Sequence, residues 1–83
     1  MEFGDRSDRI AHSGPATVWR QVADDIAADI SSGEMAPGWK LPSETELAES
    51  YGVARNTIRR AVAELVEDGR LVVVHGRGTF VAE

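Results

Sequence analysis

The chain has 83 residues, 42% of them hydrophobic, which suits one small domain with a modest core. It has no cysteine, so disulfides and thiolate metal sites are excluded, and it has neither a secretory signal nor an apolar run of membrane-spanning length. The formal charge is −5, but residues 1–50 carry four Lys/Arg and ten Asp/Glu (net −6), while residues 51–83 carry five Arg and four Asp/Glu (net +1). The relatively basic C-terminal part therefore permits DNA binding by one face.

Residues 1–14 mix Asp, Arg, Ser and Gly with little periodicity. Phe3 and Ile10 are too isolated in this stretch to seed structure. We therefore expect a disordered N-terminal tail over residues 1–14, followed by a single domain over residues 15–83.

An amphipathic helix is predicted from about Thr17 to Ser32. Its apolar residues recur at spacings of three and four, and they are Trp19, Val22, Ile26 and Ile30. Thr17 is a plausible start signal and Gly33 a plausible stop. We read the tryptophans of the chain, Trp19 and Trp39, as packing residues and not as platforms for base stacking.

A turn at residues 35–38 and a short extended strand at residues 39–41 separate this helix from the next, because Leu41 precedes a proline and is biased to an extended backbone. The run Ser43-Glu44-Thr45-Glu46 then fits a capping box, with Ser43 as N-cap and Glu46 reaching back. The short helix that this box opens ends at Gly52.

The next helix is predicted from about Arg55 to Asp68, and a hairpin follows it. The buried positions of this helix are expected to be Ile58, Ala61, Val62 and Leu65. The short segment of residues 71–75 is rich in β-branched valine and is predicted to be a strand. Residues 76–78 form a flexible turn, and residues 79–81 return as a partner strand. The fold class is thus α+β, mainly α: a winged helix-turn-helix with three helices, a C-terminal β-hairpin wing and a short strand before the second helix.

The start of the third predicted helix is electrically unusual. A helix N-terminus carries partial positive charge, yet Arg55 lies in its first turn and Arg59 one turn further along the same face. No acidic residue lies three or four positions from Arg59, whereas Glu64 lies four residues after Arg60 and is placed to pair with it. Two unpaired guanidinium groups at this end of a helix point to an anionic partner, and nucleic acid is the obvious candidate.

These residues together resemble the DNA-binding domain of the GntR family of bacterial transcription regulators. The resemblance covers roughly residues 17–82. Its ordered signature consists of Ile30, Gly33, Pro37-Gly38, Leu41-Pro42-Ser43-Glu44, Leu47-Ala48, Tyr51-Gly52-Val53, Arg55, Thr57-Ile58-Arg59-Arg60-Ala61, Leu65, Gly69 and Gly76-Arg77-Gly78-Thr79-Phe80-Val81.

The resemblance implies a homodimer on a two-fold symmetric operator, with the recognition helix in the major groove and the wing at the minor groove. It places the family's contact positions on Ala54, Arg55, Thr57, Arg59, His75, Gly76 and Arg77. Two positions depart from the family: Thr45 stands where arginine is common, and Ala54 stands where serine or threonine usually caps the helix. The C-terminal effector and dimerisation domain of the family is also missing, so the chain is either an excised DNA-binding domain, which we favour, or a stand-alone short protein.

For some candidate DNA contacts, a structural role such as helix capping would also explain the residue. Arg55 and Arg59 are the strongest candidates, because arginine pairs with guanine O6 and N7 in the major groove. Asn56 either reads adenine or helps to cap the helix, Thr57 is expected to donate to phosphate, and Ser43 acts as cap with or without a phosphate contact. In the wing, the glycine-flanked Arg77 suits a narrow minor groove, while His75 is ambiguous. The full candidate set is Ser43, Thr45, Ala54, Arg55, Asn56, Thr57, Arg59, His75, Gly76, Arg77 and Gly78.

The leading functional hypothesis is therefore a sequence-specific DNA-binding module of a cytoplasmic transcription regulator, most simply a repressor. The alternative is a winged helix that binds an acidic protein partner. The histidines His12 and His75 lie far apart and no carboxylates converge, so we expect neither enzymatic activity nor a cofactor. Because no exposed apolar stripe remains once the core is assigned, the isolated fragment is expected to be mainly monomeric.

Overall fold

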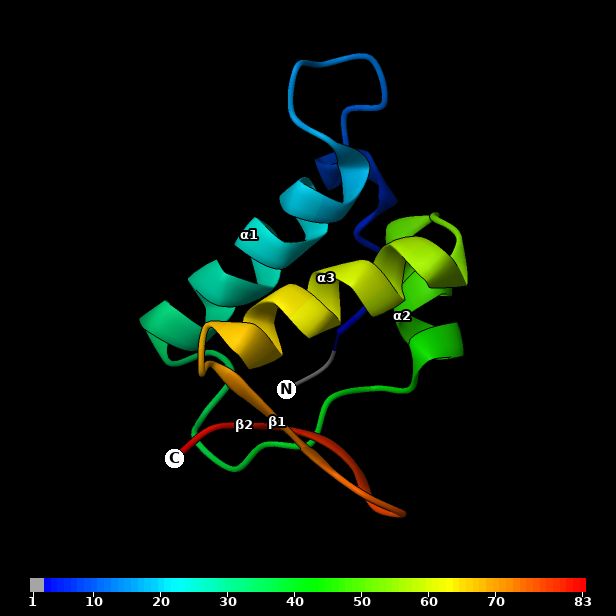
Figure 1. Ribbon diagram of the computed structural model, residues 1–83. Coiled ribbons are helices and arrows are strands. Elements are labelled where there is room, and N and C mark those ends of the chain that lie inside the picture. The colour runs from blue at the N-terminus through cyan, green and yellow to red at the C-terminus, as the bar shows by residue number, and fades with distance from the viewer. Residues whose placement is uncertain (1–2) are drawn as a thin grey trace.

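The computed structural model describes residues 3–83 and contains three α-helices followed by a β-hairpin (Figure 1). In chain order the elements are a short 3₁₀ helix η1 (Ser7–Arg9), α1 (Val18–Ser32), α2 (Glu44–Tyr51), α3 (Arg55–Glu67), β1 (Leu71–Val74) and β2 (Gly78–Val81). The helices and the antiparallel hairpin confirm the prediction of a mainly helical winged helix-turn-helix.

The helix ends follow the local sequence signals. The Thr17 side chain accepts a hydrogen bond from the Arg20 amide and caps α1, and Ser43 and Glu46 form the predicted capping box at α2. Gly33 and Gly52 end α1 and α2 in the left-handed conformation, at φ +87° and +67°. Glycine is suited to both positions because it has no Cβ to clash there.

The core lies where α1 and α3 pack against each other, with α2 and β1 closing it (Figure 1). Its largest fully buried side chains are Tyr51, Ile26, Met35, Leu47, Ile58, Leu71 and Val22. Met35, which the sequence placed in a turn, has a fully buried side chain. Val62 and Ile30 are only half-buried and pack at the edge of the core, and Trp19 is also half-buried.

The hairpin formed by residues 71–81, hereafter the wing, projects below α3 in Figure 1. Instead of a full strand before α2, the structure has a single bridge in which Lys40 pairs with Phe80. The Leu41 amide donates to the Thr79 carbonyl at 2.8 Å, and Pro42, which has no N–H, cannot extend the pairing further. The predicted short strand is thus a one-residue bridge that anchors β2.

Strand β1 leaves apolar side chains in solvent. Val72, Val73 and Val74 are 46%, 58% and 38% exposed, and only Leu71 of this strand is buried. The prediction that no exposed apolar stripe remains is therefore wrong. The reason is topological: a two-stranded sheet at the edge of the domain has no second layer to cover it.

The N-terminal segment also differs from the sequence prediction. Met1 and Glu2 lie outside the described residues, but between Phe3 and Ile10 the chain packs on the domain instead of forming the expected disordered tail, whereas residues 11–17 are exposed. Arg6 and Ile10 are buried, and Phe3 is half-buried against Tyr51. Composition alone misses this because the segment is held by a few specific polar contacts and not by a run of apolar residues.

Candidate nucleic-acid interface

The first turn of α3 presents exposed polar groups at the positive end of the helix. Ala54 is the N-cap and makes no side-chain hydrogen bond to the helix, in contrast to the capped starts of α1 and α2. Arg55 and Asn56 are exposed, and Thr57 is half-buried. Within residues 3–83, the Arg55 guanidinium makes no ion pair or hydrogen bond. A free cation thus stands at a helix end that already favours anions.

Arg59 is paired, contrary to the sequence prediction. Its Nε donates to Glu44 Oε2 at 3.1 Å and its Nη2 donates to Oε1 at 2.9 Å. Its Nη1 also donates to the Asn56 side-chain oxygen at 3.3 Å. The sequence argument considered only neighbours on the same helix, whereas Glu44 lies in the first turn of α2, which the helix-turn-helix brings alongside α3.

The pKa values of Glu44 and Arg59 shift in the directions expected of an ion pair. Hydrogen bonds from Arg59 hold the pKa of Glu44 below its usual value of 4.5, and those same bonds raise the pKa of Arg59. Both shifts favour the charged forms. Because both side chains are substantially exposed, solvent screens their attraction, and DNA phosphate is able to compete for the guanidinium.

Arg60 does not pair with Glu64 as predicted. Its guanidinium lies 4.5 Å from the centroid of the Trp19 ring, and that of Arg20 lies 4.6 Å from the same ring. Glu64 instead accepts a hydrogen bond from Arg20 Nη2 at 3.2 Å. Trp19 thus packs between helices as expected, but it does so by holding two cations at the α1–α3 seam.

The tip of the wing is an exposed turn that carries one cation. His75, Gly76 and Arg77 are exposed, and the Arg77 amide donates to the Val74 carbonyl at 2.9 Å to close the turn. Gly78 adopts φ +131°, and a Cβ added there would lie 2.9 Å from Lys40 Cε. Glycine is therefore favoured at position 78 by its backbone conformation, whereas the contact with Lys40 involves only the end of a flexible side chain, which can move aside.

A groove of about 910 Å³ runs between α3 and the wing. Of the predicted site residues it brings together Ser43, Arg59, His75, Gly76, Arg77 and Gly78. The others lie outside its lining: Thr45 is exposed in the first turn of α2, and Ala54, Arg55, Asn56 and Thr57 form the start of α3. The candidate site is therefore a surface with two parts, the α3 N-terminus and the groove beside the wing.

Sequence reasoning missed three charged residues of this groove, Lys40, Glu44 and Glu46, the last of which was predicted only as part of the capping box. Lys40 reaches the wing because its backbone pairs with Phe80, and its side chain lies over Gly78. Glu44 follows directly after the predicted N-cap Ser43. Its role was recoverable in principle, since a helix-turn-helix places the start of its first helix near the recognition helix.

Other kinds of site are not found in the part of the chain that the structure describes. Within residues 3–83, no three His, Asp or Glu side chains gather as ligands for a metal ion. No helix in that range has the length and apolar character needed to cross a membrane.

Residues 19–81 match the family described as "Bacterial regulatory proteins, gntR family". The chain belongs to the GntR family. The chain is 39% identical over 74 residues to the HTH-type transcriptional repressor NagR of Bacillus subtilis, covering 89% of this chain and 30% of that protein. It is 44% identical over 81 residues to the histidine utilization repressor of Pseudomonas aeruginosa, covering 95% of this chain and 32% of that protein. The chain thus spans about a third of the length of these relatives.

Solved structures resemble the GntR domain closely. The DNA-binding domain of AraR in complex with operator ORX1 has a TM-score of 0.77 and 40% identity, covering 88% of this chain and 94% of that one. YtrA of Sulfolobus acidocaldarius, a GntR-family transcription factor, has a TM-score of 0.83 and 38% identity, covering 89% and 78%. The residues described above therefore form a GntR-type winged helix-turn-helix domain.

Proposed function

We propose that this GntR domain binds double-stranded operator DNA sequence-specifically and that the protein acts as a transcriptional repressor. The observation that carries the proposal is the free guanidinium of Arg55 in the exposed, uncapped first turn of α3. The AraR domain that is 40% identical to this chain is described in complex with an operator, and it has the same fold over 88% of the chain. NagR and the histidine utilization repressor are named as repressors.

In the proposed complex α3 lies in the major groove. Arg55 reads guanine, which is worth roughly 1–3 kcal/mol of discrimination against a wrong base. Arg59 leaves Glu44 for DNA, Thr57 donates to phosphate, and phosphate satisfies the free amides that Ala54 does not cap. Asn56 serves either as an adenine contact or as a partner that orients Arg59.

The remaining contacts come from the wing and from the start of α2. Arg77, at the exposed turn between Gly76 and Gly78, enters the minor groove, and His75 approaches the backbone beside it. Lys40 adds a cation at the base of the wing. Ser43 and Thr45 face the phosphate chain at the start of α2, where Thr45 offers a hydroxyl in place of the positive charge that arginine would bring.

Two domains acting as a homodimer on a palindromic operator complete the proposal, as the helix-turn-helix geometry suggests. The isolated chain is proposed to be mainly monomeric in solution, although Val72, Val73 and Val74 are exposed. Its place of action is the cytoplasm, at the chromosome. The proposal includes no catalysis and no cofactor.

The test is to select bound duplexes from a random pool and then to measure affinity for the selected and a scrambled duplex by fluorescence anisotropy. Arg55→Ala is expected to reduce the preference for the selected duplex by about tenfold, within the range given by one base contact. Arg70→Ala is the matched control, because Arg70 is also an exposed arginine but lies beyond the other end of α3 and bonds Ser31.

The same experiment tests the alternative of a protein-binding winged helix. Attraction to any duplex that weakens with salt is expected of both functions and does not separate them. Enrichment of one sequence separates them, because a surface for an acidic protein has no reason to distinguish bases. A folded domain that enriches no sequence would overturn the DNA proposal.

A further inference from the structure

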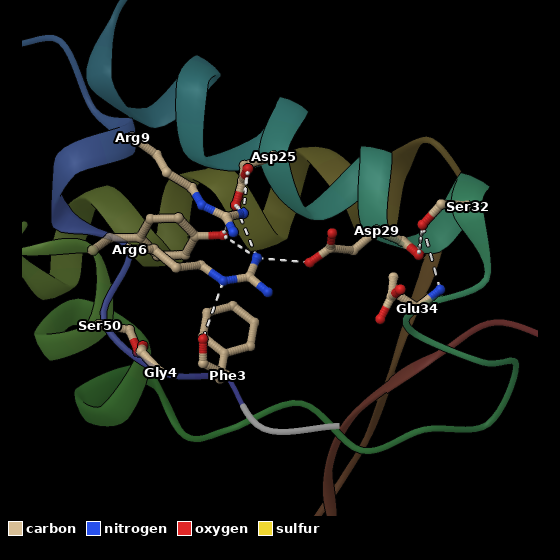
Figure 2. Close-up of polar contacts among 10 residues, drawn as sticks. Phe3, Gly4, Arg6, Arg9, Asp25, Asp29, Ser32, Glu34 and Ser50 are labelled. Carbon is tan, nitrogen blue, oxygen red and sulfur yellow. Dashed lines mark hydrogen bonds and ion pairs between the residues drawn. The ribbon is translucent and has the colours of Figure 1, made fainter.

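An arginine that the DNA site does not use is buried between α1 and the end of α2. Arg6 is 3% exposed. Its Nη1 lies 2.9 Å from Asp25 Oδ2 and 2.6 Å from Asp29 Oδ2, both on α1, and it donates to the Tyr51 hydroxyl at 3.3 Å (Figure 2). The guanidinium carbon also lies 3.8 Å from the centroid of the Phe3 ring. One guanidinium thus joins α1 to the last residue of α2.

The surrounding chain is tied to the same two helices. We call residues 3–11 the strap. The Arg6 amide donates to the Ser50 carbonyl at 2.7 Å, and the Ser50 hydroxyl donates to the Gly4 carbonyl. At its far end, the backbone of Ala11 exchanges two hydrogen bonds of 2.7 Å with the Gln21 side chain on α1. The strap is therefore fixed at both ends and spans from α1 to α2.

The contacts of the strap lie beside the turn that joins α2 to α3. Tyr51 ends α2, Gly52 follows it, and Arg55 begins α3. A Cβ on Gly52 would lie 3.1 Å from Ser7 Cβ, so the strap also rests against the turn of the helix-turn-helix. A buried charge with several partners is satisfied in one arrangement only, whereas apolar contacts tolerate small shifts.

We propose that Arg6 is a positioning residue for DNA recognition, because it fixes the carboxyl end of α2 against α1 and thereby sets the turn that carries Arg55. The DNA part of this inference rests on the proposed function. Arg6 lies outside residues 19–81, the part of the chain that matches the family.

The test compares Arg6→Gln with Arg9→Gln in the 83-residue chain. Arg9 is the matched control: it lies in the same strap, bonds the same Asp25 carboxylate at 3.0 Å and loses the same charge, but half of its side chain is exposed. We expect Arg6→Gln, and not Arg9→Gln, to change the backbone amide shifts and to speed the hydrogen exchange of residues 50–56. This measurement uses no DNA, so it tests the strap even if the proposed function fails.

The second measurement is affinity for the selected duplex at a temperature where each variant is folded. Arg6→Gln is expected to lower this affinity by about tenfold, comparable to the loss of one base contact. The dependence of log affinity on log salt should keep its slope, because a buried residue that touches no phosphate releases no counterions. A slope reduced by about 0.9 would mean that Arg6 itself contacts phosphate, and the positioning role would be overturned.

Deletion of residues 1–11 provides a second variant. It removes the segment that covers Asp25 and Asp29, so these carboxylates become exposed to solvent and are not left buried without a cation. It is expected to fold, to lose affinity by at least the same factor as Arg6→Gln, and to show the same amide changes at residues 50–56. A deletion variant that binds the selected duplex as tightly as the 83-residue chain would contradict the proposal. If neither variant folds, the strap is a part of the core and not a positioning element, which also overturns it.

Discussion

Glu44 holds Arg59 by two parallel hydrogen bonds, of 3.1 and 2.9 Å, across the two helices of the helix-turn-helix. The free domain therefore keeps one of the two arginines proposed to contact DNA paired with a carboxylate. Glu44→Gln should release Arg59 and remove a negative charge beside the groove. We expect affinity for non-specific duplex to rise severalfold and its salt dependence to become steeper by about 0.9, the value for one added phosphate contact. Anisotropy titrations between low and physiological salt measure both.

Glu49→Gln is the control for this prediction. Glu49 is an exposed carboxylate on the same helix, and its side chain makes no ion pair within residues 3–83. If both variants raise affinity equally and by the same slope, the gain reflects net charge, and the pair does not restrain Arg59.

The uncapped start of α3 predicts a stabilising substitution. Ala54 has the extended backbone of an N-cap, at φ −71° and ψ 152°, but no side-chain acceptor. Ala54→Ser should supply one and stabilise the domain by about 1 kcal/mol, which for a domain of this size corresponds to roughly 4–8 °C in melting temperature. Ala63→Ser, at an exposed position within α3, should give no gain because serine is a weaker helix former there. Equal melting temperatures for Ala54→Ser and the parent would contradict the prediction.

The environment of Asp25 predicts that the stability of the domain falls in acid. Burial alone would raise its pKa, but hydrogen bonds from Tyr51, Arg9 and Arg6 outweigh burial and hold the pKa below the usual 3.8. A carboxyl with a lowered pKa in the folded state contributes stability above its unfolded pKa and loses that contribution as pH falls through its folded pKa. The free energy of unfolding should therefore drop as pH falls below about 3.8.

Asp25→Asn isolates this contribution. The variant should be less stable than the parent at pH 7, and the difference should shrink in acid, as urea unfolding from pH 7 to pH 2.5 would show. Asp24→Asn is the control, since its side chain is 68% exposed and contacts Arg20 only at 3.6 Å. A parent and an Asp25→Asn variant with parallel pH profiles would refute the assignment.

The two turn glycines of the wing should differ in their tolerance of a side chain. Gly78→Ala places a side chain at φ +131°, a backbone conformation almost restricted to glycine, and should destabilise the wing by about 1–3 kcal/mol. Gly76→Ala, at φ +77° in open space, should cost less, roughly 1 kcal/mol. Amide hydrogen exchange of residues 71–81 reports the loss locally. The reverse order of the two variants would contradict the geometry described for Gly78.

The elements that were predicted correctly are those specified by nearby residues. Helix periodicity, the Ser43–Glu46 capping box and the glycines at positions 33 and 52 each act within one turn of chain. The features that were missed depend on distant partners. Arg6 bonds residues 19 and 45 positions away, and Arg59 bonds one 15 positions away. Composition counts the charges of residues 1–14 as solvated, but it does not show that Asp25 and Asp29 form a site for one of them.

The candidate site divides in the same way. The free position of Arg55 at the start of α3 agrees with the sequence argument, although its DNA contact stays a prediction. The pairing of Arg59 with Glu44 and the stacking of Arg60 on Trp19 required the packing of two helices to be known. A one-dimensional pattern identifies which cations lie on a face, but only the fold determines which of them already have partners.

The span from Arg6 to Tyr51 also fixes an order of events during synthesis. The strap is synthesised before α1 and α2, and Tyr51 follows Arg6 by 45 residues, so the strap remains undocked until α2 is complete. For that interval the buried arginine and Phe3 are open to proteases. The strap therefore precedes α1 and α2 in synthesis but reaches its final position only after α2 has formed.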